Sequence, residues 1–559
     1  MSDNLTNTSI MGLNKIAIVC NSPVNESKKR NSNPPDYKAF ATAKSCGFNV
    51  VMYPGSEVEK DNEWIEYMDK ALTYCSQVGI KLISNSPILC YNPKDKKRTG
   101  WPKEFIELYP KTKTPEWELT QKDKKRNITQ DALNALVGWQ LKDEPYYQNW
   151  HKPNYFYEET KNGVTTTKLP EEESEDGMSK KVYDVGKLPG EGLEPLVTDH
   201  GENNYSIKQI DCDNILENHT IITEVDNKRP VFSNLAVDND PKWIGHNSTY
   251  NEFLDEYISK FNPPLLSFDY YPIETINDDN VFQEDAFYQN LLMFANKSKQ
   301  YNIPFWAYCL CLEHLSGPGG RHYPYPTEGM MRIEAFSALA FGAQGIVYWQ
   351  YRLDDLNSET SSCQTSQSSP TLNEGTQIGG IDSIGSSTFM GADENGVPVH
   401  GHGITTSVWQ SIKNINRDII KENKKFFNCK FIKHRLCAGD HEYSLNGDAG
   451  IDKIKASGKG FLMTRIETPD PEETYADGEQ VINEYIVIVS RDPFESQELE
   501  WTEYQNVVSY TGLDNPDFDW HDNKDDFEGN SNGNHTVVNP MPQRFTETLQ
   551  PGGYKIFKC

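Results

Sequence analysis

Short apolar runs alternate with helix-like segments along roughly the first 430 residues, and this alternation restricts the fold more than any other feature of the chain. Strands that are buried on both faces and joined through helices form parallel sheets. Eight such runs predict a closed (β/α)8 barrel more than an open doubly wound sheet, and no Gly-rich nucleotide-binding loop follows the first run. The eight runs are 15–20, 48–55, 81–86, 136–145, 230–237, 265–272, 304–313 and 345–352. Segments with helical spacing separate them, including 37–46, 64–78, 250–261, 285–301 and 328–342.

Three long insertions interrupt this alternation of strands and helices, near 86–127, 158–204 and 355–404. The second is acidic and polar, and the third is rich in Ser, Thr and Gly. Loops that follow barrel strands lie at the carboxyl end of the barrel, where active sites are built. We therefore expect the last two insertions to border the site.

The sequence pattern changes beyond Phe427. A helix that begins near residue 405 has apolar residues spaced for one buried face, at Trp409, Ile412, Ile415 and Ile419. The later runs are short, β-rich and separated by Gly, Asn, Asp and Pro, which predicts an all-β sandwich. The predicted organisation is an N-terminal arm at 1–14, a catalytic barrel at 15–425 and a C-terminal β-sandwich at 426–559.

The net charge and the cysteine content of the chain limit the binding partners and cofactors that we expect. The net charge of -28 opposes a phosphodiester backbone, so we expect no nucleic acid and favour a neutral substrate. Eleven cysteines occur without CxxC pairs or histidines at ligand spacing, so neither a metal site nor a disulfide framework is expected, and no cofactor is implied. No apolar run is long enough for a membrane span, and the N-terminus lacks a secretory signal. This predicts a cytoplasmic protein, or a periplasmic or secreted one if a signal has been removed; homo-oligomerisation is left open.

Polar and aromatic residues close the later apolar runs, where barrel enzymes place their catalytic groups. Two of them, Glu144 and Glu313, end strands four and seven, which are nearly opposite on the ring. Two carboxyl groups between aromatic walls suit glycoside hydrolysis, because one protonates the leaving oxygen while the other attacks the anomeric carbon or activates water. The further candidates for substrate contact are Asp143, Trp139, Asn234, Asp269, Tyr270, Tyr271, His314, Trp349 and Arg352.

Two stretches resemble the clan A glycoside hydrolases, and in particular the family 42 β-galactosidases. "GWQLKDEP" is similar to the family's Trp-Gln-x-Asp-Asn-Glu pattern at the end of strand four. "LEHLSGPGGRHYPYPTEGMMRIEAFSALAFGAQGIVYWQYR" resembles the segment from strand seven to strand eight, where a nucleophilic Glu precedes a helix with Arg and Gly-Ala and then an aromatic strand ending in Arg. The second match spans about forty residues and is the stronger one.

This resemblance implies residue roles. Glu144 would be the general acid/base and Glu313 the nucleophile of a retaining mechanism, with their carboxyl groups about 5 to 5.5 Å apart. Trp349 would form the floor under the sugar, and Tyr270 or Tyr271 would donate a hydrogen bond to Glu313. The expected substrate is an oligosaccharide or glycoside with a β-linked sugar, a β-galactoside by resemblance.

Asp143 departs from the family pattern, which has Asn at this position. An ionised Asp accepts hydrogen bonds only, and its charge beside Glu144 would help to keep that acid protonated. Two other hypotheses stay open: a non-hydrolytic carbohydrate-binding barrel whose catalytic site has lost its activity, and a metal-dependent hydrolase. Each motif also has a structural reading, since Asp143 to Pro145 suits a turn and Trp349, Tyr270 and Tyr271 suit barrel packing.

For several neighbouring residues a structural role is the preferred interpretation. Trp306 and Phe268 are expected to pack inside the barrel. Cys309 and Cys311 are expected to be small core residues, and Arg332 to bridge helix and barrel.

Overall fold

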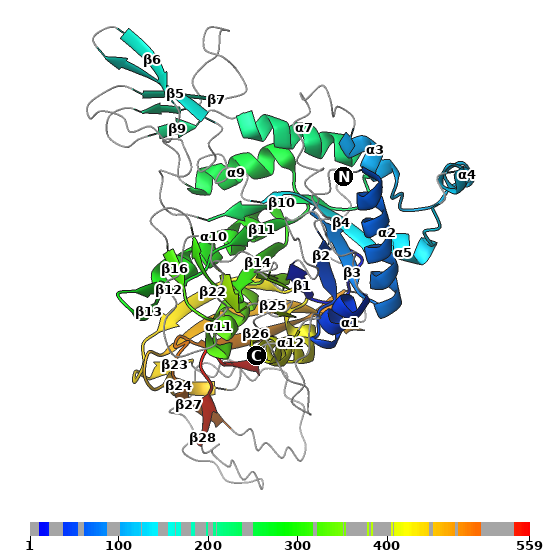
Figure 1. The fold of residues 1–559 in the computed structure, drawn as a ribbon. Coiled ribbons are helices and arrows are strands. Elements are labelled where there is room, and N and C mark those ends of the chain that lie inside the picture. Colours follow the sequence, from blue (N-terminus) through cyan, green and yellow to red (C-terminus); the bar gives the residue numbers. More distant parts are fainter. Residues whose placement is uncertain are drawn as a thin grey trace, which may run out of the picture.

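The computed structural model describes a barrel, its inserted sheets and a β-sandwich (Figure 1). The described residues are 11–21, 37–53, 61–85, 101–123, 126–143, 155–161, 164–168, 180–184, 197–199, 205–207, 210–237, 250–316, 321–349, 352–353, 377–379, 382–383, 404–405, 407–445, 451–475, 479–504 and 542–559. Glu144 lies outside them, as do large parts of the three insertions.

Eight parallel strands close into a barrel in the order β1-β17-β14-β11-β10-β4-β3-β2. Every predicted apolar run overlaps one of these strands, so the prediction of a (β/α)8 barrel is confirmed. The strands are β1 (Ala17–Asn21), β2 (Val50–Tyr53), β3 (Lys81–Ser84), β4 (Leu136–Asp143), β10 (Val231–Ala236), β11 (Leu266–Asp269), β14 (Phe305–Leu310) and β17 (Gly345–Trp349).

Alternation along the strands divides their side chains between two cores. One fills the barrel interior and contains Val19, Phe232, Trp306 and Tyr308. The other lies between the barrel and its helices, and it contains Phe268, which stacks on Phe294 at 4.0 Å. The expectation that both residues pack inside the barrel is therefore confirmed for Trp306. It is wrong for Phe268, whose side chain points outward into the core between the barrel and its helices.

The helices cover the outside of the barrel (Figure 1). Those predicted from spacing all form, within a few residues of the expected bounds. The helices are α1 (Tyr37–Ser45), α2 (Asp61–Val78), α3 (Trp101–Glu107), α4 (Pro115–Asp123), α5 (Gln130–Ala135), α7 (Ile210–Val225), α9 (Tyr250–Phe261), α10 (Glu284–Tyr301), α11 (Glu328–Ala340), α12 (Ser407–Lys421) and α13 (Asn423–Phe426). None of the helices in the described ranges is long and apolar enough to cross a membrane.

Three small sheets are inserted after barrel strands. The first follows strand four and has the order β6-β5-β7-β8-β9; it projects from the barrel (Figure 1). Its strands are β5 (Tyr155–Lys161), β6 (Val164–Lys168), β7 (Lys180–Asp184), β8 (Val197–Asp199) and β9 (Tyr205–Ile207). The second contains β12 (Ile273–Ile276), β13 (Asp279–Phe282), β15 (Leu312–Ser316), β16 (Arg321–Tyr323) and β19 (Gln377–Gly379), and the third β18 (Arg352–Leu353), β20 (Asp382–Ser383) and β21 (Ile404–Thr405).

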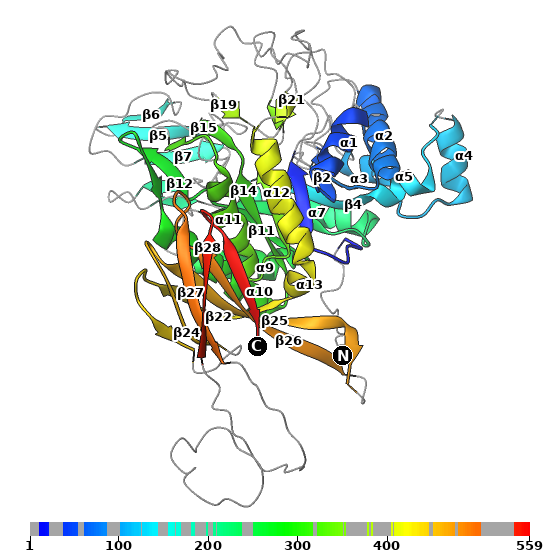
Figure 2. The same ribbon diagram turned by 90° about the horizontal axis from the view of Figure 1, so that it is seen from below.

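Two four-stranded antiparallel sheets form the C-terminal sandwich, as predicted. It packs on the barrel through α11, since Tyr554 stacks on Phe336 at 4.0 Å and Phe431 stacks on Phe341 at 5.1 Å. The view in Figure 2 shows β25 and β26 beside α12 and α13. The strands are β22 (Lys430–Cys437), β23 (Tyr443–Ser444), β24 (Ile451–Ala456), β25 (Phe461–Thr474), β26 (Gln480–Ser490), β27 (Gln497–Tyr504), β28 (Pro542–Leu549) and β29 (Tyr554–Lys558).

Candidate active site

Two polar side chains meet at the carboxyl ends of strands five and six. The Asn234 amide nitrogen donates to Asp269 at 2.9 Å, and the Ser267 hydroxyl donates to the Asn234 oxygen at 2.9 Å. Leu235, Leu266 and Phe268 belong to the outer core and Tyr270 packs against it, so alternation directs the side chains of Asn234, Ser267 and Asp269 to the barrel interior. The structure thus brings Asn234 and Asp269 together at the mouth, with Ser267 as a support that sequence reasoning missed, and their role as substrate contacts stays a prediction.

Aromatic rings lie at the same mouth. The rings of Tyr271 and Trp349 stack with their centroids 5.9 Å apart and an interplanar angle of 17°, and Tyr323 meets Tyr271 edge-on at 5.7 Å. Both Tyr271 and Trp349 are only partly buried, and both pack against the top of the interior core. We call Tyr271 and Trp349 the aromatic platform. Partly exposed rings of this kind suit the apolar face of a sugar.

Glu313 is held by a neighbouring histidine. Its Oε1 lies 2.8 Å from the Nε2 of His322, a residue of β16. The two side chains are 18% and 29% exposed, so the pair is sheltered and still open to solvent. This pairing could not be predicted from local sequence, because the contact depends on how β15 and β16 align. His322 orients the carboxylate through this contact.

The position of Glu313 differs from the expected one. Barrel strand seven ends at Leu310, and Glu313 lies on the next strand, β15. On β15, Leu312 faces the core that contains Tyr323 and touches the platform. Glu313 follows it and therefore points to the other face of the strand, where it meets His322. The carboxylate and the aromatic platform lie on different faces of this strand.

Trp139 is a correction to the predicted site. Its side chain is fully buried in the core between barrel and helices, and its indole nitrogen donates to Asp226 at 3.0 Å. Asp226 in turn accepts from the buried Arg229 at 2.6 Å. The side chain points away from the barrel interior, so Trp139 is a packing residue and contacts no substrate in the mouth.

The other predicted site residues are placed in part. Asp143 ends β4, and its backbone pairs in register with Asn234, so it reaches the mouth. Tyr270 packs against the outer core, which leaves Tyr271 as the member of that pair at the mouth. His314 is on β15 and Arg352 on β18, beyond the barrel strands that were expected to hold them. Glu144 lies outside the described residues, so its distance from Glu313 stays a prediction.

Cys309 and Cys311 are buried thiols in the outer core, which confirms their predicted role as small core residues. Burial raises the pKa of both thiols, which keeps them protonated and unreactive. Arg332 forms ion pairs with Glu328 of its own helix and with Asp418 of α12 at 2.8 and 2.9 Å, so it joins two helices.

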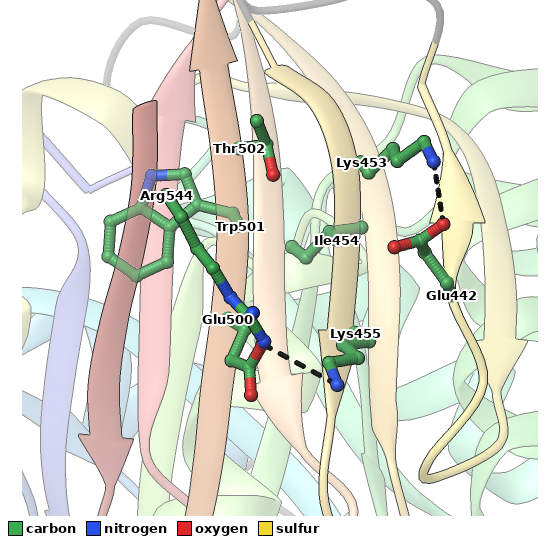
Figure 3. A pocket seen from close by; sticks show the side chains of 8 residues that line it. All are labelled: Glu442, Lys453, Ile454, Lys455, Glu500, Trp501, Thr502 and Arg544. Carbon is green, nitrogen blue, oxygen red and sulfur yellow. Dashed lines mark hydrogen bonds and ion pairs between the residues drawn. The ribbon is translucent and has the colours of Figure 1, made fainter. Parts of the chain in front are cut away.

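A separate hollow of about 420 Å³ lies on the sandwich (Figure 3). Charged side chains along its wall pair with one another, as in Lys453 with Glu442 at 2.9 Å and Lys455 with Glu500 at 3.5 Å. Among the described residues that line it, the aromatic one is Trp501, which is 7% exposed and stacks within the sandwich core. The hollow therefore offers no aromatic face to a sugar, and the barrel mouth is the better candidate site.

The barrel mouth thus holds buried polar groups and stacked aromatic rings at the carboxyl end of the barrel. The family model described as beta-galactosidase of glycoside hydrolase family 42 matches residues 206–376. This range holds Asn234, Asp269, Tyr271, Glu313 and Trp349, whereas strand four lies before it. The resemblance to family 42 is confirmed, and the family match and the closed barrel support a glycoside hydrolase that acts on a carbohydrate.

Solved structures to which the chain is similar include a catalytic mutant of a GH42 beta-galactosidase from G. stearothermophilus. It is 9% identical, the alignment covers 98% of this chain and 99% of that one, and the TM-score is 0.42. A family 1 b-glucosidase from Thermotoga maritima is 10% identical over 72% of this chain and 97% of its own, with a TM-score of 0.37. No curated protein matches the sequence. The fold assignment rests on the strand order itself.

Proposed function

We propose that the protein hydrolyses a β-linked sugar, a β-galactoside in the first instance, by a double displacement at the barrel mouth. The observation that carries this proposal is the stacked pair of Tyr271 and Trp349 beside the bonded pair of Asn234 and Asp269 at the carboxyl end of the barrel. The rings give a surface for the sugar, and the polar pair gives hydrogen-bond partners for its hydroxyl groups.

In this mechanism Glu313 attacks the anomeric carbon while Glu144 protonates the leaving oxygen. Glu144 then takes a proton from water, which displaces Glu313 and releases the sugar with its configuration retained. His322 holds the Glu313 carboxylate through the 2.8 Å contact. Asp143 and Trp349 would contact the sugar, and Arg352 and His314 would border the site.

Kinetics of glutamine variants test this assignment. Glu144→Gln and Glu313→Gln should each lower kcat for an aryl β-galactoside by at least about a thousandfold, because each loses one step of the displacement. Glu498→Gln, an exposed change on the sandwich strand β27, is the control and should keep full activity. Azide should restore turnover of an activated substrate by Glu313→Ala, since a small anion can replace the missing nucleophile. Turnover that survives in Glu313→Gln would refute the role of Glu313.

A non-hydrolytic carbohydrate-binding barrel is the second candidate. The arrangement of Glu313 favours it, because this carboxylate and the aromatic platform lie on different faces of β15. In that case calorimetric titration would detect binding of a β-linked disaccharide, and a broad panel of aryl glycosides would show no turnover. If the unmodified protein binds the disaccharide without turning it over, and the Trp349→Ala variant no longer binds it, the second candidate is correct.

A further inference from the structure

Barrel strands six and seven separate at the mouth, and this leaves a backbone donor without a strand partner. The last register pair between β11 and β14 is Phe268 with Ala307, and β11 ends at Asp269. The Cys311 amide donates to Trp349 of β17 at 2.8 Å. Successive amides of a strand point to opposite sides, so the amide of Leu310 points to the side that β11 has vacated.

A buried carboxyl group fills this place. Oε2 of Glu334, from helix α11, accepts the Leu310 amide at 2.9 Å. Glu334 is 5% exposed, so this bond is shielded from water. A buried amide without a hydrogen-bond acceptor would destabilise the fold. At the end of strand seven the Glu334 carboxyl supplies this acceptor, whereas elsewhere in the barrel a neighbouring strand supplies it.

Glu334 is suited to this task because it is neutral. Burial raises its pKa to about 8, with the Leu310 amide and the Cys309 thiol acting in the opposite direction. The titratable groups that face it from β14 are Cys309 and Cys311, and burial raises the pKa of both. A protonated carboxyl therefore accepts the amide at neutral pH without burying a charge.

The end of strand seven supports the aromatic platform. Leu310 pairs in register with Trp349, and its side chain packs with Leu312 and Tyr323 in the small core that touches Tyr271 and Trp349. Any shift of the Leu310 backbone would move the underside of the platform. β15, which carries Glu313, begins two residues later.

We propose that Glu334 is a positioning residue for the sugar site: it fixes the end of strand seven and thereby sets the place of the aromatic platform and of the strand that carries Glu313. The structural part of this inference stands on the Leu310 contact, and its consequence for sugar rests on the proposed function. Glu334 itself touches neither the sugar nor a reacting atom.

Two substitutions at Glu334 distinguish the loss of the hydrogen-bond acceptor from a change in side-chain volume. Glu334→Gln keeps an acceptor oxygen for Leu310, whereas Glu334→Leu keeps the volume and removes the acceptor. Phe336→Leu is the matched control, because it weakens the same helix on the side that packs against the sandwich.

Hydrogen exchange read by mass spectrometry tests the positioning directly. In Glu334→Leu, peptides from 305–316 should exchange at least about ten times faster, while other barrel peptides stay unchanged. Glu334→Gln and Phe336→Leu should match the unmodified protein in this segment. Equal protection of 305–316 in Glu334→Leu, or loss spread evenly over the barrel, would overturn the inference.

The sugar readout separates this inference from the proposed function. Glu334→Leu should raise KM for an aryl β-galactoside at least about tenfold with kcat falling less, and Glu334→Gln should restore both values. An unchanged KM beside faster exchange would overturn the link to the platform. If the unmodified protein binds no sugar, the proposed function fails, and the exchange experiment still decides the structural role of Glu334.

Discussion

Removing Asp226 should destabilise the barrel strongly, because this carboxylate holds two buried donors. It accepts from Arg229 at 2.6 Å and from the Trp139 indole at 3.0 Å. The Arg229 side chain is 1% exposed, so water cannot replace the lost partner. Breaking a buried ion pair on one side costs about 3–5 kcal/mol, and we expect Asp226→Leu to lower the free energy of unfolding by that amount.

The double variant makes this prediction specific. Replacing both charges by apolar side chains removes the stranded cation, so Asp226→Leu with Arg229→Met should cost less than the sum of the single changes by at least about 2 kcal/mol. The assay is urea unfolding followed by circular dichroism, with the double-mutant cycle taken from the midpoints. A cost below about 1 kcal/mol for Asp226→Leu, or strict additivity, would refute the reasoning.

Three further predictions follow from single contacts. A Cβ on Gly329 would lie 2.4 Å from the Pro493 carbonyl oxygen, so Gly329→Ala should cost about 1–3 kcal/mol, measured by the melting temperature. Cys309 should resist a thiol reagent in the native protein while the exposed Cys559 reacts, as mass spectrometry of the labelled peptides would show. The pKa of Glu334 is raised from 4.5 to about 8, so its contribution to stability is complete below about pH 4.5 and is lost as pH rises through 8. Urea unfolding should therefore show the unmodified protein losing up to about 4 kcal/mol relative to Glu334→Gln between pH 5 and pH 8; parallel curves would contradict this.

The barrel could be predicted because its signal is local. Each strand is a short apolar run, each helix has its own spacing, and eight repeats of the pair leave few other folds. The run 304–313 extended beyond its barrel strand, because the residues of β15 continue the apolar pattern after Leu310. Glu313 was therefore expected at the end of strand seven and is found on the next strand.

The direction of the side chains could not be predicted in the same way. An apolar run buried on both faces does not show which residues point inward, and register shifts along β4 change the alternation there. Trp139 was therefore expected at the site, and it lies in the outer core. The contacts of Glu313 with His322 and of Glu334 with Leu310 depend on how separate elements align, so no local pattern indicates them.

Covalent trapping of Glu313 tests the central claim most directly. An activated 2-deoxy-2-fluoro-β-galactoside forms a slowly hydrolysed glycosyl-enzyme in a retaining glycosidase, because the fluorine destabilises the transition state for release. After incubation, digestion and mass spectrometry, we expect a single glycosyl adduct on the peptide that contains Glu313, and none in Glu313→Gln. An adduct on another carboxylate such as Asp269 would contradict the role of Glu313 as the nucleophile, and the absence of any adduct although the sugar binds would contradict the proposed double displacement.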